Sequence, residues 1–424
     1  MPRELVIKGG RVLTPDGPRP GDVAIKDGVV VAVGDDLDGK HVLDAAGCVV
    51  GPGLVDLHTH LREPGREEAE TVDSGARAAA LGGYTAIVAM PNTEPAIDCA
   101  AVVREVLELG ASSCCDVRVA GAITVGRAGE RLAPLGEMAD LGVRLFTDDG
   151  AGVQDARLMR RAFEYATALD VTLGQHCEDA ALAAGGHMHE GEWSSRLGIA
   201  GIPAEAEELM IMRDLALARL TGARVHFLHV STAGSVELLR SAREDIRYSA
   251  EAAPHHFTLT DEAVAGYDPL FKVNPPLRSA NDVAAIKAAL ADLTIGVIAT
   301  DHAPHAAEAK EAPFDEAPPG MLGLETALAL ALTELDLTEQ QVFDRMSARP
   351  AEIAGLAGHH GVWIEKGAPA NLCVVDPAAQ WVVDPAALAS RSRNTPYAGR
   401  KLTGKVRHTI LRGEPIVIDG VAQR

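Results

Sequence analysis

Histidine and aspartate residues follow several apolar, strand-like segments of the sequence, at positions where they could bind metal ions. His58 and His60 are two residues apart, so on a strand both rings point to the same side. An HxH pair alone is a weak sign of a metal site. Other ligand-type residues end further segments of this kind, and these are an aspartate at 148–149, His176, His229 and Asp301.

Imidazole and carboxylate ligands together suit Zn²⁺, with Mn²⁺ or Co²⁺ as alternatives. Six such residues exceed the three protein ligands that one catalytic zinc ion usually has. They are enough for two ions that lie ~3.5–4 Å apart. We therefore predict a binuclear site. Only one of Asp148 and Asp149 can face it, because neighbouring side chains of a strand point to opposite sides.

Eight apolar segments are the candidates for the strands that carry these residues. Most are separated by Ala-, Leu- and Glu-rich stretches with helical spacing, such as residues 206–220. Such alternation predicts an α/β fold, a (β/α)₈ barrel of the TIM type with its active site at the carboxyl ends of the strands. The segments are 54–57, 85–90, 117–123, 143–146, 171–173, 225–230, 247–250 and 295–299.

Both ends of the chain have a different texture, with short β segments and hairpin-type turns such as Gly9-Gly10. This pattern predicts one small β-sandwich domain that both termini build together. We place its two parts at residues 1–52 and 361–424, and the metal-dependent barrel at residues 53–360.

Composition limits the function classes. The chain has 424 residues, of which 47% are hydrophobic and 23% charged, as in ordinary globular proteins. Its net charge of −21 argues against binding to nucleic acid or to an anionic membrane surface. No apolar run approaches the ~18 residues of a membrane helix. Six cysteines without a CxxC pair indicate reduced thiols, so a cytoplasmic location is expected. An anionic substrate would need local positive groups.

The remaining histidines have structural or open interpretations. Strand alternation turns His226 away from the metal ligands, and we interpret it as structural. His255, His256 and His302 could support the ligands or merely cap strands. Glycine-rich loops are expected to leave four others solvated, namely His187, His189, His359 and His360.

Four motifs, in this order along the chain, resemble the signatures of the dihydroorotase family within the cyclic amidohydrolase superfamily. They are DLHTHLR at 56–62, MPNT at 90–93, NPPLR at 274–278 and DHAPH at 301–305. The resemblance covers essentially the whole chain and is closest to the long, class I bacterial dihydroorotases. It implies a zinc-dependent, reversible cyclisation of N-carbamoyl-L-aspartate to (S)-dihydroorotate plus water, the third step of de novo pyrimidine (UMP) biosynthesis.

The resemblance also implies how two zinc ions per subunit would be held. One ion would be bound by His58, His60 and Asp301, and the other by His176 and His229. A carboxylate would bridge both ions, and it maps to Asp149, with Asp148 as the competitor. Asp301 would also be the catalytic acid and base, taking a proton from the attacking water and passing it to the leaving nitrogen.

The same resemblance implies a substrate site. Its side chains would be His60, Arg62, Asn92, Asn274 and His305, joined by the backbone at Pro319 and Gly320. Arg62, Asn92 and His305 would hold the free carboxylate, since a guanidinium matches a carboxylate with two bonds. Proline has no N–H, so a backbone donor there must be Gly320. Residues 304–320 are expected to form a long flexible loop over the site.

Two alternatives compete with this interpretation. Hydantoinases, dihydropyrimidinases and allantoinases bridge their metals with a carboxylated lysine at the end of strand four. Between residues 52 and 365 the only lysines are Lys272, Lys287 and Lys310, none of them near that position. A non-catalytic scaffold for aspartate carbamoyltransferase would be expected to lose ligands, yet all are present. A homodimer and a complex with aspartate carbamoyltransferase stay open as partners of the chain.

Overall fold

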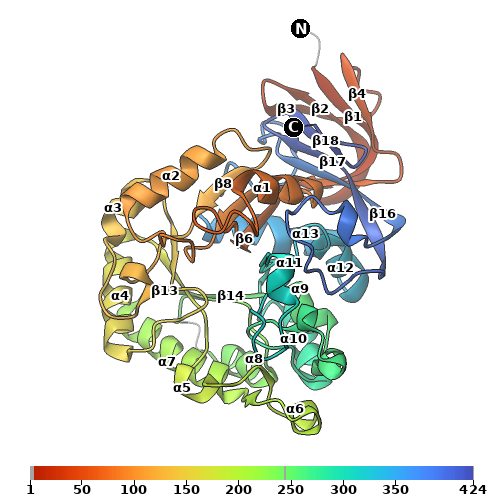
Figure 1. Cartoon of the computed structure of the whole chain (residues 1–424). Helices are drawn as coiled ribbons and strands as arrows, with labels where there is room; N and C mark the ends of the chain where they lie inside the picture. Colours follow the sequence, from red (N-terminus) through yellow and green to blue (C-terminus); the bar gives the residue numbers. More distant parts are fainter. Residues whose placement is uncertain (1–3, 243–244, 424) are drawn as a thin grey trace.

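The computed structural model describes residues 4–242 and 245–423, and its centre is a ring of parallel strands surrounded by helices (Figure 1). The expected barrel of eight strands is confirmed. Each strand overlaps one of the eight apolar segments. The strands are β6 (Leu54–Thr59), β7 (Tyr84–Ala89), β8 (Asp116–Val119), β9 (Leu145–Thr147), β10 (Thr172–Gln175), β13 (Arg224–Phe227), β14 (Tyr248–Ala252) and β15 (Val297–Ile298).

Hydrogen bonding closes these strands into a ring. One sheet has the order β6-β7-β8 and another the order β15-β14-β13-β10-β9, all with parallel neighbours. Isolated parallel bridges join Gly121 to Phe146 and Thr59 to His302, which connects the two sheets at both seams. The carboxyl ends of all eight strands therefore surround one opening.

The helices around the strands start where side chains cap them. Thr71 and Ser279 each accept a hydrogen bond from a backbone N–H of the first turn, a contact that stabilises a helix by ~1 kcal/mol. The predicted helix at 206–220 is confirmed as α7. The main outer helices are α1 (Val72–Leu81), α2 (Ala100–Gly110), α3 (Leu135–Asp140), α4 (Ala156–Leu169), α7 (Glu205–Thr221), α8 (Ala233–Arg240), α10 (Ala280–Asp292) and α12 (Ala327–Glu334).

Shorter elements fill the connections. They are η1 (Val125–Arg127), α5 (Ala180–Ala183), β11 (Met188–His189), α6 (Glu192–Leu197), β12 (Gly201–Ile202), α9 (Pro254–Thr258), η2 (Asp261–Gly266), η3 (Pro269–Phe271), α11 (Ala307–Lys310), α13 (Glu339–Phe343), the π-helical turn η4 (Asp344–Ala348), α14 (Arg349–Ile353) and η5 (Pro385–Ala387). Within residues 4–242 and 245–423, no helix has the length and apolarity to cross a bilayer.

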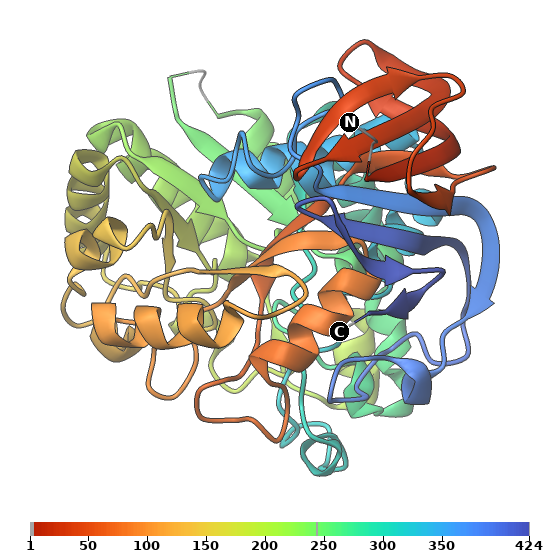
Figure 2. The ribbon, with the colours of Figure 1, turned by 90° about the horizontal axis from the view of Figure 1, so that it is seen from above.

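Both termini build a second domain, as predicted, and Figure 2 shows their strands side by side. Nine strands form one branched sheet in which β5 of the N-terminal part pairs with β16 of the C-terminal part. The exact boundaries at residues 52 and 360 stay a prediction. The strands are β1 (Leu5–Thr14), β2 (Gly17–Lys26), β3 (Val29–Gly34), β4 (His41–Asp44), β5 (Val49–Pro52), β16 (Leu372–Val382), β17 (Lys401–Leu411), β18 (Glu414–Ile418) and β19 (Val421–Ala422).

The junction of the two domains gives a stability prediction. A Cβ atom added at Gly51 in β5 would overlap the ring of Phe343 in α13, whereas one at Gly34 would meet nothing within 4 Å. Neither glycine has a positive φ, so the pair isolates packing from backbone strain. We expect Gly51→Ala to lower the free energy of unfolding by ~1–3 kcal/mol in a denaturant titration. Gly34→Ala should leave it nearly unchanged, and equal effects would contradict the packing argument.

Candidate active site

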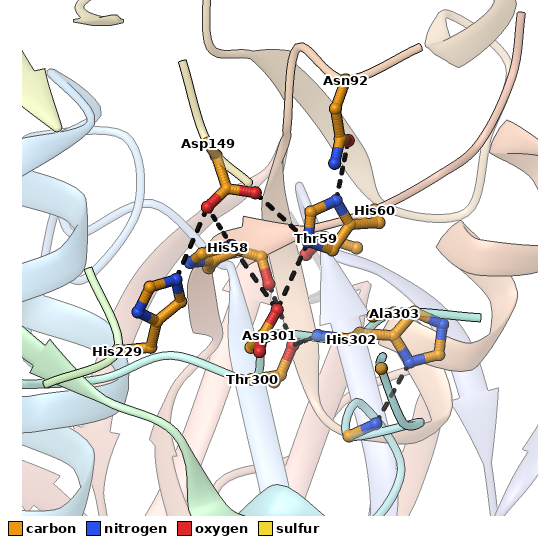
Figure 3. Close-up of polar contacts among 12 residues, drawn as sticks. His58, Thr59, His60, Asn92, Asp149, His229, Thr300, Asp301, His302 and Ala303 are labelled. Atoms are coloured by element: carbon orange, nitrogen blue, oxygen red, sulfur yellow. Dashed lines mark hydrogen bonds and ion pairs between the residues drawn. The ribbon is translucent and has the colours of Figure 1, made fainter. Parts of the chain in front are cut away.

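Six residues converge at the carboxyl ends of the barrel strands, and they are the six predicted as metal ligands. All six are buried, and at most 5% of the surface of each residue is exposed. Figure 3 shows most of them pointing toward one another across the opening. They come from the end of β6 (His58) and the residue just after it (His60), from the residues just after β9 (Asp149), β10 (His176) and β13 (His229), and from the segment after β15 (Asp301).

Asp149 lies at the centre of this group. Its Oδ1 is 3.5 Å from His58 Nε2, 3.6 Å from His176 Nδ1 and 3.5 Å from His229 Nε2. Its Oδ2 is 3.6 Å from His60 Nε2. These separations exceed the ~2.7–2.9 Å of a charge-assisted hydrogen bond. They are close to the ~3.3 Å between two ligand atoms that each lie ~2.0–2.1 Å from a tetrahedral zinc ion.

Asp301 approaches the same group from the other side. Its Oδ1 is 3.3 Å from His60 Nε2 and 3.5 Å from His58 Nε2. His58 is thus shared, since its Nε2 faces both carboxylates. Among the described residues, two sets have ligand atoms within 4.8 Å of one another, and these are His58 with His60 and Asp301, and His58 with Asp149 and His229.

Asp148, the competitor for the bridging position, faces elsewhere. Its Oδ1 accepts hydrogen bonds from the backbone N–H groups of Ile123 at 2.8 Å and Thr124 at 3.0 Å, and its Oδ2 accepts one from the Thr124 hydroxyl. Asp148 therefore ties the end of β9 to the segment after β8. The geometry favours Asp149 as the ligand, in agreement with the family resemblance, and only one of the two faces the site, in agreement with strand alternation.

Unpartnered atoms test whether the group fits a metal ion. Among the described residues, no hydrogen-bond partner meets His58 Nε2 or Asp149 Oδ1, which are buried and lie 3.5 Å apart. The ring nitrogens of His176 (Nδ1) and His229 (Nε2) that face Asp149 lie 2.9 Å from each other. A buried polar atom without a partner costs ~1–3 kcal/mol. Cations would supply the missing partners for lone pairs of nitrogen and oxygen. The residues therefore fit metal ions of the kind that imidazole and carboxylate ligands prefer.

The charges of this group also favour a metal ion. Burial raises the pKa of Asp149 and of Asp301, but neighbouring imidazoles outweigh burial and hold both values below the usual range. For Glu251 behind them, burial also raises the pKa, yet His58 and His226 lower it to about 2. Three carboxylates thus stay ionised at neutral pH in a buried space. Such a concentration of negative charge favours divalent cations.

Glu251 was missed by sequence reasoning, and it orients His58. Its Oε1 is 2.7 Å from His58 Nδ1 and accepts from the His229 backbone N–H at 3.3 Å. Its Oε2 is 2.9 Å from His226 Nε2, and His226 Nδ1 is 2.8 Å from Ser249 Oγ. An ionised carboxylate only accepts, so we assign the proton of His58 to Nδ1, which leaves the Nε2 lone pair facing the site. The signal was a charged residue inside an apolar strand.

Of the three histidines whose role the sequence did not decide, one faces the site and two contact residues outside it. His255 faces the site, with Nε2 3.7 Å from Asp301 Oδ2. His256 donates from Nε2 to the Pro275 carbonyl at 2.9 Å. His302 turns away, and its Nε2 lies 3.3 Å from Glu70 Oε2.

One expectation for the loop histidines is wrong, because His360 is buried and not solvated. Its Nε2 is 2.9 Å from Asp116 Oδ2 and its Nδ1 is 3.0 Å from Thr85 Oγ1. The segment that carries it folds back on β7 and β8, a tertiary contact that a glycine-rich sequence does not reveal. His189 is only partly exposed, and its Nδ1 lies 3.2 Å from an Arg278 guanidinium nitrogen.

The residues predicted to hold the substrate carboxylate lie beside the metal-ligand group. Asn92 accepts from His60 Nδ1 at 2.8 Å through Oδ1, which leaves its NH₂ group for another partner. His305 donates from Nε2 to the Pro319 carbonyl at 2.8 Å. Arg62 is 7% exposed and donates from Nε to the Pro304 carbonyl at 3.1 Å. The site therefore has donors at its mouth.

The guanidinium of Arg62 forms no ion pair with any of the described residues. Every salt bridge found in residues 4–242 and 245–423 involves other cations. Burial lowers the pKa of Arg62 to about 10, so the guanidinium still carries its charge at neutral pH.

The φ of Arg62, 62°, is in the left-handed region, as are those of His229 (33°) and Asp301 (46°). Such strain costs ~1–3 kcal/mol per residue and is typical of functional sites.

Two predicted substrate contacts have other partners in this structure. The Gly320 N–H, proposed as a backbone donor, donates to the Lys272 carbonyl at 2.9 Å. It is therefore engaged within the chain. Asn274 donates from Nδ2 to Glu178 Oε1 at 3.2 Å, while its buried Oδ1 has no partner among the described residues. A substrate contact at Asn274 would use that oxygen.

Known proteins match the chain over its whole length. A family model described as dihydro-orotase-like matches residues 47–235. The chain is 50% identical to the dihydroorotase of Pelotomaculum thermopropionicum, over 99% of both chains, and 52% identical to that of Streptomyces coelicolor, over 98% of this chain and 99% of the relative. The solved L-hydantoinase (dihydropyrimidinase) from Arthrobacter aurescens is similar at a TM-score of 0.89 and 26% identity, covering 100% of this chain and 98% of that one.

Glu251 gives a prediction for metal binding. Glu251→Gln keeps the shape of the side chain, but the new NH₂ group would face an N–H group that now donates a hydrogen bond to the carboxylate. Two donors cannot bond each other, so that contact would be lost. We expect the affinity for Zn²⁺ to fall ~10–100-fold in a titration against a competing chelator. Glu70→Gln is the matched control, since Glu70 is equally buried but contacts none of the six residues. An equal loss in both variants would contradict the orienting role of Glu251.

Proposed function

The chain belongs to the dihydroorotase family, and from this premise we propose how its residues perform that activity. The protein is a metal-dependent hydrolase of a cyclic amide. It interconverts N-carbamoyl-L-aspartate and (S)-dihydroorotate in pyrimidine biosynthesis. The observation that carries our assignment of residues is the buried Arg62 guanidinium, which has no ion pair among the described residues, beside a group of six buried imidazoles and carboxylates.

We assign two Zn²⁺ ions to this group. His58, His60 and Asp301 would hold one ion, His176 and His229 would hold the other, and Asp149 would contact both. When bound, the ions polarise the amide carbonyl and lower the pKa of the attacking water. Support comes from the unpartnered His58 Nε2 and Asp149 Oδ1 and from the ligand separations of 3.3–3.6 Å.

Asp301 is the group placed to move the proton. Its Oδ1 faces His58 and His60, whereas its Oδ2 points toward the space near His255. In ring opening, Asp301 takes a proton from the water and delivers it to the leaving ring nitrogen; in ring closure the order reverses. The lowered pKa of this carboxylate fits a group that begins ring opening ionised.

Arg62 would bind the free carboxylate of the substrate. The net charge of −21 repels an anion, so recognition depends on local cations. The guanidinium is charged, buried and without an ion pair in the described part of the chain, and Asn92 keeps its NH₂ group for the same partner. A neutral cyclic amide would leave Arg62 buried and unpaired, which disfavours a hydantoinase-like substrate.

Three expectations about the protein's surroundings stay proposals: a homodimer, a complex with aspartate carbamoyltransferase and a cytoplasmic location. Light scattering on the purified protein, alone and mixed with the transferase, tests the first two.

The metal assignment predicts the effect of metal removal. Full extraction with a strong chelator should abolish turnover of dihydroorotate, and added Zn²⁺ should restore it together with two bound ions per chain by elemental analysis. The protein should stay folded by circular dichroism, since the barrel core lies outside the site. Full activity of metal-free protein would exclude the proposed role of the ions.

The substrate assignment predicts a specificity change. Arg62→Met should lower kcat/KM for dihydroorotate by at least ~10–100-fold, because a charge-assisted bond to the carboxylate is lost. Dihydrouracil has the same ring without the carboxylate, and its slow turnover should change little. Comparing the two substrates separates carboxylate binding from damage to the metals. Equal losses for both would show that Arg62 does not bind the carboxylate.

A further inference from the structure

The segment 304–320 is anchored at its base, which differs from the free loop that the sequence suggested. Asn394 of the C-terminal part accepts from the His305 N–H at 3.1 Å through Oδ1. Its Nδ2 donates to the carbonyls of Ala303 at 3.0 Å and Gly320 at 3.1 Å. One side chain therefore holds both ends of the segment together.

Lys310 anchors the middle of the segment. It closes α11 and is 7% exposed, although lysine is rarely buried without an anionic partner. Its Nζ donates to the carbonyls of Pro269 at 3.0 Å, Lys272 at 3.3 Å and Pro318 at 2.8 Å. The first two belong to η3 and its end, and the third belongs to the segment itself. The Lys310 Nζ group thus joins the segment to η3, because it donates to backbone carbonyls on both sides.

Lys272 makes the reciprocal contact from the η3 side. It is equally buried, and its Nζ donates to the Asp315 carbonyl at 3.0 Å and lies 5.6 Å from the centre of the Phe314 ring. Phe314 in turn is 6% exposed in an apolar cluster with Met188 and Val264. Each lysine therefore reaches across the same boundary to bind the backbone of the other side.

These contacts fix the residues assigned to the substrate. The Lys272 carbonyl accepts from Lys310 and also from the Gly320 N–H at 2.9 Å. Pro319 follows Pro318, a Lys310 acceptor, and its carbonyl accepts from His305. The positions of His305, Pro319 and Gly320 thus depend on where Lys310 and Lys272 hold the segment, together with Asn394 at its base.

We propose that Lys310 and Lys272 form a reciprocal clasp that keeps segment 304–320 closed and positions the substrate-binding edge of the site. Both are positioning residues, since they act through His305, Pro319 and Gly320. The proposal rests on the proposed function only for the identity of the substrate.

The test uses Lys310→Met in the metal-loaded, full-length protein. Methionine keeps the apolar stem but removes the donor. Hydrogen–deuterium exchange without substrate should become about tenfold faster or more in peptides from 304–320 and stay unchanged in the barrel strands. KM for dihydroorotate should rise about tenfold, with a smaller change in kcat and an unchanged metal content.

Lys287→Met is the control, because Lys287 in α10 pairs with Glu334 of α12 at 3.2 Å and its Nζ has no hydrogen bond to the segment in the described residues. It should change neither measurement. Lys272→Met is a second, independent variant. If both lysines act as one clasp, the double variant should exchange little faster than the more affected single variant, because the effects of coupled residues are not additive.

The outcomes separate this proposal from the proposed function. Wild-type exchange in Lys310→Met and Lys272→Met would overturn the clasp. Faster exchange with an unchanged KM for dihydroorotate would overturn the positioning role. If the wild-type protein failed to turn over dihydroorotate while exchange still accelerated in the variants, the proposed function would fall and the clasp would stand.

Discussion

The structure of the site depends on the burial of ionised carboxylates among imidazoles. Asp149 and Asp301 lie with their oxygen atoms 3.3–3.6 Å from imidazole nitrogens, and water is almost excluded from both. Anions in such a space are costly unless cations or hydrogen-bond donors compensate them. Every other feature of the site either supplies that compensation or holds the ligand atoms where a cation can use them.

The barrel makes this arrangement possible, because the carboxyl ends of its strands bring residues that are far apart in sequence to one opening. Glu251, in β14, then fixes the proton on the outer nitrogen of His58, in β6. The same carboxylate accepts from His226 and from the His229 backbone. Three strands are thus coupled through one side chain. An error in the position of Glu251 would move ligands of both proposed ions.

Much of this could be predicted because alternation along strands is a strong signal. The eight segments and the ligand-type residues at their ends follow from that periodicity. Alternation allowed only one of Asp148 and Asp149 to face inward, and the family resemblance pointed to Asp149. Glu251 escaped because the predicted segment ended at residue 250, whereas β14 continues to Ala252. Strand boundaries are the least certain part of a sequence-based prediction. His360 is held by tertiary contacts alone, for which the sequence has no periodic signal.

Charge distribution explains how so acidic a chain can recognise an anion. The barrel segment contains few lysines, and two of them, Lys272 and Lys310, are buried beside segment 304–320 without a carboxylate contact in the described residues. Arg62 is likewise buried nearby, and within the described part of the chain it has no ion pair. The Arg62 guanidinium, charged and without a protein counter-ion in the described residues, keeps its potential for a ligand, whereas surface pairs such as Arg240 with Asp292 cancel locally. The acidic surface and the cationic mouth are therefore compatible, because burial at low dielectric makes the local field dominate at short range.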